Sequence, residues 1–222
     1  MDYREFSSRQ ELEAAGLDLL REAFTAPEPL PRAIMLTGGS TPFGIYQALA
    51  GTGIQAQAGV HVFLSDERYV PLETGDSNYG RMRSMLDAVG IVKRYTVDSS
   101  VPPAIAASRY AADMEGLVAK GIPVTLAILG LGADGHLAAL FSADQIAQAK
   151  GKMAVAVNRP DGMTGISLGP DMLCRSGQIV FWVCGEGKRA AVDALLNRPS
   201  SIPAGIALDG AQQVSVWYSP QD

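Results

Sequence analysis

The sequence predicts an α/β fold, in which a mostly parallel sheet is flanked by helices on both faces. Two observations predict it. Short apolar runs alternate with segments of helical periodicity along the whole chain. These runs are apolar at consecutive positions, which is typical of strands buried on both faces. A single domain covering residues 1–222 is expected, because no linker, internal repeat or low-complexity tract divides the chain.

The composition is that of a globular protein. The chain has 222 residues, a formal net charge of −5 and a hydrophobic fraction of 47%. It can therefore bury a full core, which excludes a disordered or collagen-like protein. The negative charge argues against nucleic-acid or anionic-membrane binding by bulk electrostatics. It does not exclude a small anionic ligand, because local donors can bind phosphate on an acidic protein.

The sequence also bears on location and on cysteine chemistry. No run approaches the ~20 uncharged apolar residues that span a bilayer, and the first residues lack the features of a signal peptide, so a cytoplasmic location is expected. Cys174 and Cys184 have no second cysteine pair or nearby histidine. We interpret both as buried small hydrophobic residues, not as zinc ligands or a disulfide.

The first helix is expected over residues 8–25. Ser8 and Glu11 have the spacing of a capping box. One apolar face is then predicted by residues at three- and four-residue spacing, namely Leu12, Ala15, Leu19 and Ala23. Prolines in residues 27–31 end this helix, and the apolar run 33–36 that follows is expected to be a buried strand.

The same alternation continues toward the C-terminus. Strands are expected at 60–64, 124–129, 153–157, 179–183 and 213–218, and helices at 79–89, 105–120 and 188–196. In parallel sheets of this kind, ligands bind outside the carboxyl ends of the strands. Candidate functional residues are therefore sought directly after each strand.

A glycine-rich turn follows the strand 33–36. Gly38 and Gly39 let the backbone approach a ligand, and Ser40 and Thr41 offer hydroxyl groups. Pro42 suits the start of a helix whose free N–H groups point back into the turn. This pattern predicts a phosphate cradle, with a capped tight turn as the alternative. The Gly-Lys-Ser/Thr ending of a nucleotide P-loop is missing.

Charged side chains follow two other strands. Asp66, Glu67 and Arg68 come after the strand 60–64, where Asp66 could meet a polar ligand and Arg68 could hold a phosphate or carboxylate through two hydrogen bonds. Lys188 opens a predicted helix after the strand 179–183, and a bound anion would offset its unfavourable interaction with the helix dipole. A solvated surface position is the alternative for each of them.

A histidine follows the strand 124–129 on a second glycine-rich turn. The neutral imidazole of His136 could accept a proton from water, and Asp134 could fix its tautomer. A polar turn with a helix-capping aspartate is the alternative. The other histidine, His61, lies inside a predicted strand and is expected to be structural.

The same turn matches the dinucleotide pattern G-x-G-x-x-G at residues 130–135. That pattern expects an acidic residue about 20 positions later, at the end of the next strand. Lys150 lies 20 positions after Gly130, and the next predicted strand is followed by Asn158 and Arg159. The missing acid makes a nucleotide site the weaker interpretation.

Taken together, four segments resemble the 6-phosphogluconolactonases, within the superfamily that also contains the glucosamine-6-phosphate deaminases. They read LTGGSTP at 36–42, SDERYVP at 65–71 with DSN at 76–78, GLGADGHLAALF at 130–141 and GEGK at 185–188. The resemblance implies a Rossmann-like fold similar to glucosamine-6-phosphate deaminase. It also implies hydrolysis of 6-phospho-D-glucono-1,5-lactone to 6-phosphogluconate, in the oxidative pentose phosphate pathway.

Two positions favour a lactonase over a deaminase. The deaminase motif resembles D-E-Y where this chain has Arg68 as the third residue, and it carries a glutamate where this chain has Phe141, which cannot titrate. Two other positions depart from the family pattern. Gly165 stands where the family usually has an arginine, so Arg159 or Arg175 could supply the missing phosphate contact, and Ser142 replaces a common proline.

The resemblance and the residues together predict the roles of the site. His136 is the expected general base on water, and Asp134 orients its ring. The phosphate is expected on residues 38–41 with Lys188 and Arg68 as cationic partners, or with Arg68 facing the carbonyl oxygen instead. No metal or other cofactor is predicted, because no Cys/His/carboxylate cluster has ligand spacing. The oligomeric state is not predicted.

Three alternatives remain at this stage. An amino-sugar-phosphate deaminase or isomerase and a non-catalytic sensor of a sugar phosphate or dinucleotide are both compatible with an anion site of this kind. A hydrolase with a serine nucleophile is a further alternative, but the chain has no G-x-S-x-G elbow. In each case the expected partner is a small molecule.

Overall fold

The computed structural model describes residues 1–222 and contains two sheets. The larger is fully parallel, with the spatial order β1-β10-β9-β6-β2-β3-β5. Its strands are β1 (Asp2–Glu5), β2 (Arg32–Leu36), β3 (Val60–Leu64), β5 (Lys93–Arg94), β6 (Val124–Leu129), β9 (Gln178–Cys184) and β10 (Val214–Ser219). The smaller sheet is antiparallel and consists of β4 (Asp66–Arg68), β8 (Thr164–Leu168) and β7 (Ala154–Asn158). The prediction of a mostly parallel sheet is confirmed.

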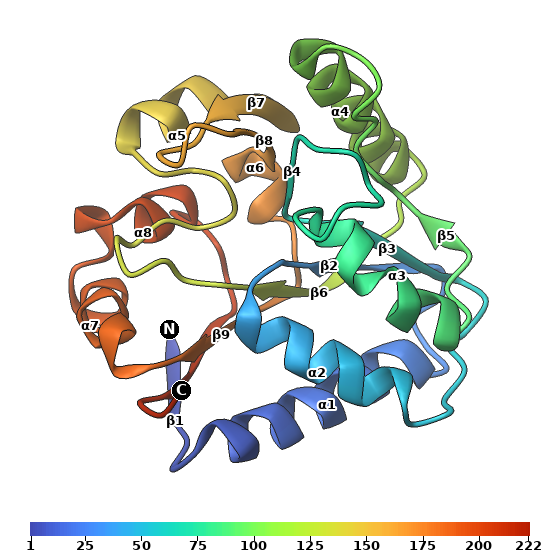
Figure 1. Ribbon diagram of the computed structural model, residues 1–222, viewed down its shortest axis with the longest axis horizontal. Helices are drawn as coiled ribbons and strands as arrows, with labels where there is room; N and C mark the ends of the chain where they lie inside the picture. Colours follow the sequence, from blue (N-terminus) through green and yellow to red (C-terminus); the bar gives the residue numbers. More distant parts are fainter.

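Helices cover both faces of the parallel sheet (Figure 1). One face packs against α1 (Arg9–Thr25), α2 (Ser40–Ala50) and α3 (Asn78–Ala88). The other packs against α4 (Pro103–Ala119), α7 (Arg189–Asn197) and the small sheet, joined by the short helices α5 (Ala143–Ala149), α6 (Pro170–Leu173) and α8 (Pro203–Ala207). Two 3-10 turns, Glu186–Lys188 and Pro199–Ser201, flank α7. No helix has the length and apolar character that a membrane crossing requires.

The strands divide the core into two clusters. In β2, Ile34 and Leu36 pack with α1–α3, whereas Ala33 and Met35 pack on the opposite side. This division arises because successive side chains of a strand point to opposite faces. Both sets are fully buried, which explains why β2 is an uninterrupted apolar run in the sequence.

The first helix begins as predicted, and its most buried residues lie beside the predicted face. Ser8 accepts a hydrogen bond from the N–H of Glu11 at 3.2 Å, and the Glu11 carboxylate accepts one from the N–H of Ser7 at 3.1 Å. The buried residues are Leu12, Gly16, Leu20 and Phe24. Of the predicted face, Leu12 is fully buried, whereas Ala15, Leu19 and Ala23 are partly buried and pack against the edge of the same core. The contact is made through Gly16, where an added Cβ would lie 3.1 Å from the Trp182 ring.

The other predicted elements are present within two residues of their expected bounds. The strand expected at 153–157 is β7, which lies in the antiparallel sheet and not in the parallel one. The interpretation of the cysteines is confirmed for Cys184, which is buried, and was wrong for Cys174, which is only partly buried. Burial raises the thiol pKa of both.

Candidate active site

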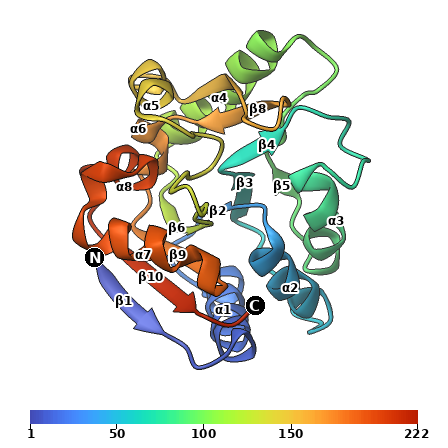
Figure 2. The same ribbon diagram turned by 60° about the vertical axis from the view of Figure 1, so that its left-hand side comes forward.

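The segments that follow four neighbouring strands converge on one cleft. The strands β9, β6, β2 and β3 are adjacent and parallel, so their carboxyl ends lie at the same edge of the sheet (Figure 2). The cleft at this edge has a volume of about 170 Å³. It lies where parallel α/β sheets bind their ligands.

Six of the nine predicted site residues line this cleft, namely Gly38, Gly39, Asp66, Arg68, His136 and Lys188. The structure does not bring the other three into the lining. Ser40 is exposed at the start of α2, Thr41 is buried, and Asp134 lies behind the ring of His136. The lining residues that were not predicted are Thr37, Asn78, Gly130, Leu131, Gly132 and Ala138. Arg159, one of the two arginines considered for the missing phosphate contact, also lines the cleft.

The Gly38–Gly39 turn presents unpaired donors to the cleft. The backbone N–H groups of both glycines donate to no protein group. Gly39 has φ +112°, a conformation that favours glycine, and a side chain at position 38 would overlap the amide of Asn78. With the N-terminus of α2 directly behind it, this turn can hold an anion.

The strand β4 separates the roles of three consecutive charged residues. Asp66 and Arg68 point to the cleft, and Glu67 points away from it because side chains alternate along a strand. Glu67 is 1% exposed. It accepts hydrogen bonds from the backbone N–H groups of Asn78 and Tyr79, at 2.7 and 2.8 Å. Glu67 therefore fixes the start of α3 and is not available to a ligand.

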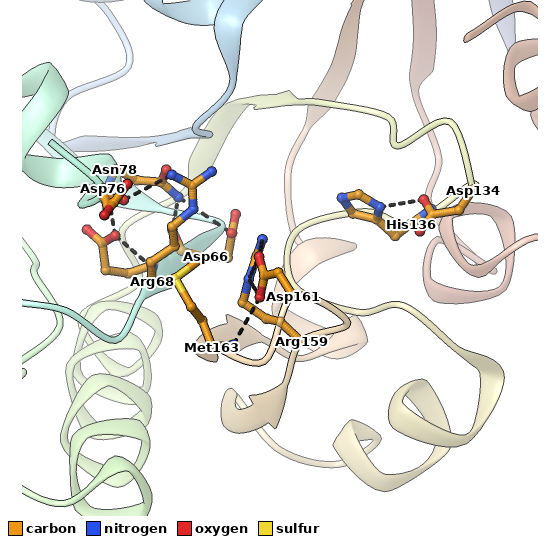
Figure 3. Close-up of polar contacts among 10 residues, drawn as sticks. Asp66, Arg68, Asp76, Asn78, Asp134, His136, Arg159, Asp161 and Met163 are labelled. Carbon is orange, nitrogen blue, oxygen red and sulfur yellow. Dashed lines mark hydrogen bonds and ion pairs between the residues drawn. The ribbon is translucent and has the colours of Figure 1, made fainter. Parts of the chain in front are cut away.

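Asp66 is a buried carboxyl group among cations. Burial raises its pKa, and a hydrogen bond from Ser65 at 2.7 Å opposes that increase. The charges of Arg159, of His136 when its ring is protonated, and of Arg68 act in the same direction, in decreasing order. The amide of Asn78 donates to the carbonyl oxygen of Asp66 at 3.1 Å and holds this corner of the cleft (Figure 3).

His136 is held by Asp134. The imidazole Nδ1 lies 2.5 Å from a carboxylate oxygen of Asp134, which also accepts the backbone N–H of His136 at 3.2 Å (Figure 3). Burial alone would raise the pKa of Asp134, but these hydrogen bonds outweigh it and hold the pKa below its usual value. An ionised carboxylate can only accept, so the proton of a neutral imidazole is on Nδ1. Nε2 is then free to accept a proton.

Two glycines shape the turn that carries His136. A side chain at Gly132 would overlap both the ring of His136 and the carboxylate of Asp134. Gly135 has φ +80°, and an added Cβ there would lie 2.7 Å from Ile202. The presence of these two glycines in the G-x-G-x-x-G pattern is therefore explained by the packing of the turn, without a bound dinucleotide.

Neighbouring groups complete the surroundings of His136. The ring of Phe141 lies 4.3 Å from the imidazole, between ring centroids. Lys188 donates to the carbonyl oxygen of Leu131 at 2.8 Å, which ties it to the same turn. Burial lowers the pKa of Lys188, and Asp134 and Asp222 oppose that effect. The other histidine, His61, lies inside β3 as expected, 2.9 Å from the Tyr95 hydroxyl, and does not line the cleft.

The structure also places the residues that depart from the family pattern. Arg159 lines the cleft, whereas Arg175 is exposed after α6 and does not. Ser142 caps α5, because its hydroxyl accepts the N–H of Gln145 at 3.2 Å. Arg159 directly follows the strand β7, whereas Arg175 follows the helix α6.

Comparison with known proteins shows the family of the chain. Residues 8–217 match the family described as glucosamine-6-phosphate isomerases/6-phosphogluconolactonase. A 6-phosphogluconolactonase from Nostoc sp. is 33% identical over 81% of this chain and 78% of its own. One from Haemophilus influenzae is 26% identical over 98% of this chain and 96% of its own. The structure of 6-phosphogluconolactonase from Trypanosoma brucei superposes with a TM-score of 0.83 at 25% identity, covering 98% of this chain and 95% of that one.

Proposed function

The chain belongs to the glucosamine-6-phosphate isomerase/6-phosphogluconolactonase family, and we propose that it hydrolyses 6-phospho-D-glucono-1,5-lactone to 6-phosphogluconate, in the oxidative pentose phosphate pathway. One observation carries the proposal. The free Nε2 of His136 belongs to a cleft that is also lined by Arg68, Lys188 and the Gly38–Gly39 turn. A base and an anion site therefore share one cavity. The proposal includes a cytoplasmic location, as expected from the sequence.

The first step requires an activated water molecule. Nε2 of His136 accepts a proton from water while the water oxygen bonds to the lactone carbonyl carbon. Asp134 stabilises the imidazolium that forms, because its carboxylate already accepts the Nδ1 proton. A positioned base of this kind typically contributes about 10²- to 10⁴-fold in rate.

The substrate presents two anionic groups to accommodate, the permanent phosphate and the transient oxyanion. The phosphate would lie on the N–H groups of Gly38 and Gly39, with Lys188 as a cationic partner. The oxyanion that develops on the carbonyl needs a donor aimed at it. Arg68 is available for either task, because the only protein hydrogen bond of its guanidinium goes to the carbonyl oxygen of Asp76, at 3.1 Å.

The second step opens the ring. The bond between the carbonyl carbon and the ring oxygen breaks, and the imidazolium of His136 returns its proton to that oxygen. The product is a carboxylic acid, which ionises in water. Each turnover therefore releases one proton to the solution and leaves His136 neutral again.

The environment of His136 supports hydrolysis over deamination. Phe141 packs on the imidazole at the position where the deaminase motif carries a glutamate. A deaminase needs that second titratable group for proton transfer on the ring-opened amino sugar, and an aromatic ring cannot supply it. The similar proteins from Nostoc sp. and Haemophilus influenzae are both named 6-phosphogluconolactonase, which also favours hydrolysis.

A direct assay distinguishes the candidate functions. Freshly generated 6-phosphogluconolactone is added to the protein, acid release is followed with a pH indicator, and the spontaneous ring opening is subtracted. Catalysed acid release supports the lactonase. Ammonia from glucosamine 6-phosphate would identify a deaminase, and a ligand-induced rise in melting temperature without turnover would identify a sensor.

A further inference from the structure

One cation of the cleft already has an anionic partner. Arg68 and Lys188 donate to backbone carbonyl oxygens, whereas Arg159 forms an ion pair with Asp161. In that pair Nη2 lies 2.8 Å and Nε lies 3.1 Å from the same carboxylate oxygen. The Arg159 side chain is only 13% exposed, although it lies in the loop between β7 and β8. Figure 3 shows this pair at the centre of the view, between Arg68 with Asp66 on one side and His136 with Asp134 on the other.

The position of Arg159 depends on a missing side chain in β8. Gly165 lies opposite Arg68 on β4 and opposite Val157 on β7. The Arg159 side chain folds back over this glycine. A Cβ at position 165 would lie 3.3 Å from Cδ and 3.4 Å from Cγ of Arg159. It would also lie 3.0 Å from Cβ of Ala139, so a larger side chain would compete for the space that Arg159 uses.

Arg159 also adjoins the proposed base through an aromatic ring. Its guanidinium carbon lies 5.2 Å from the centroid of the Phe141 ring, and that ring lies 4.3 Å from the imidazole of His136. Among the positive charges that lower the pKa of Asp66, that of Arg159 has the largest effect. The guanidinium is thus directed to the interior of the cleft and not to solvent.

The pair with Asp161 leaves part of the guanidinium free. Asp161 engages Nε and Nη2, while Nη1 donates to no protein group. The Asp161 side chain is 40% exposed and also accepts the N–H of Met163 at 3.1 Å, so it can lose Arg159 without becoming a buried unpaired charge. A phosphate group carries about −1.5 to −2 charges at neutral pH and competes well with one carboxylate.

We infer that Arg159 binds the phosphate of the substrate, that Gly165 makes room for it, and that Asp161 holds its guanidinium when no substrate is bound. This inference rests on the proposed function, because it assigns a contact to that substrate. Arg159 is then a binding residue, and Gly165 and Asp161 are positioning residues.

The test compares a phosphorylated with an unphosphorylated lactone. Arg159→Ala should raise KM for 6-phosphogluconolactone by about 10- to 100-fold, the range for a lost hydrogen bond to a charged group. Its kcat should change little, because the contact is present in both the ground state and the transition state. KM for glucono-1,5-lactone, which has no phosphate, should not change. Arg159→Lys should retain part of the affinity.

Three further variants separate binding from a general structural effect. Arg175→Ala removes an exposed arginine outside the cleft and should match the wild type. Asp161→Asn should lower KM for the phosphorylated lactone, because it removes a competing anion. Gly165→Val should raise that KM, and it should add nothing in an Arg159→Ala background, because both changes remove the same contact.

The inference is overturned by a wild-type KM in Arg159→Ala, or by an equal rise of KM for both lactones. It can also fail or hold independently of the proposed activity. If the wild type hydrolyses neither lactone, the proposed function is wrong, and calorimetric titration with 6-phosphogluconate still tests Arg159. Equal affinity of wild type and Arg159→Ala in that titration would reject the phosphate contact.

Discussion

The substitution Gly132→Ala tests quantitatively how precisely the imidazole of His136 must be positioned. A Cβ at this position would overlap Nδ1 and Cε1 of His136 and a carboxylate oxygen of Asp134. Non-bonded heavy atoms prefer separations of about 3.5 Å, so in Gly132→Ala the ring and the carboxylate must withdraw by about 1 Å or more. A misplacement of about 1 Å can cost about 100-fold in rate. We therefore expect kcat to fall about 100-fold, or about 2.7 kcal/mol in the activation free energy.

A matched control lies in the same turn. Gly130 also lines the cleft, so Gly130→Ala adds a methyl group there without touching His136 or Asp134: the nearest atom to its Cβ would be the carbonyl oxygen of Gly38, at 3.9 Å, which is an ordinary contact. Neither glycine has a positive φ, so the backbone accepts alanine at both positions. The two substitutions also restrict the unfolded chain equally. The assay is acid release from 6-phosphogluconolactone, and thermal melting shows whether each variant is folded. A folded Gly132→Ala with wild-type kcat, or an equal loss in Gly130→Ala, would refute the reasoning.

Three other predictions concern the charged groups of the cleft. Asp134→Asn should lower kcat by about 10²- to 10⁴-fold with little change in KM, because an amide can donate to Nδ1 and favour the tautomer whose Nε2 carries the proton; steady-state kinetics with a wild-type kcat would contradict this. Burial lowers the pKa of Lys188, so this lysine should lose its proton at a lower pH than a free lysine, whose pKa is about 10.4. The affinity for 6-phosphogluconate, measured by calorimetry, should therefore fall with rising pH before that range is reached. Lys188→Arg should remove this pH dependence. Burial raises the pKa of Asp66, so its ionisation destabilises the fold at neutral pH. Asp66→Asn should therefore raise Tm near pH 7, and the difference from the wild type should shrink as pH falls toward about 4. A constant difference in Tm across that range would contradict the assignment.

The parallel sheet could be predicted because its central strands are buried on both faces. That burial makes β2, β3, β6 and β9 continuous apolar runs in the sequence. The edge strand β1 gave no such signal, because all four of its residues are exposed and it depends on pairing with β10. The small sheet was missed for a related reason. β8 contains Gly165, and its pairing with β4 and β7 is a tertiary contact that local sequence does not encode.

The phase of a helix is harder to predict than its existence. The capping residues and the spacing predicted α1 correctly, but apolar residues occur on two neighbouring faces of it. Contact through Gly16 decides which face is buried, since a glycine lets the helix approach Trp182 closely. Glycine has no apolar side chain to count, so the sequence pattern favoured Ala15, Leu19 and Ala23, which are only partly buried.

The candidate site was predicted to the extent that its residues directly follow parallel strands. Arg68, His136 and Lys188 do so, and all three line the cleft. Asn78 was not assigned to the site, and Arg159 was only one of two alternatives for a phosphate contact, because they enter the cleft from the start of α3 and from the β7–β8 loop. Glu67 shows the opposite case, since a charged residue in the right segment turns away to fix α3.

The most direct test of the account is the turnover of His136→Ala on 6-phosphogluconolactone, with the spontaneous rate subtracted. We predict that kcat/KM falls by about 10²- to 10⁴-fold. Melting temperature and affinity for 6-phosphogluconate should stay close to those of the wild type, because the side chain is partly exposed and its assigned role is proton transfer. A folded His136→Ala that hydrolyses the lactone at the wild-type rate would show that this imidazole is not the base.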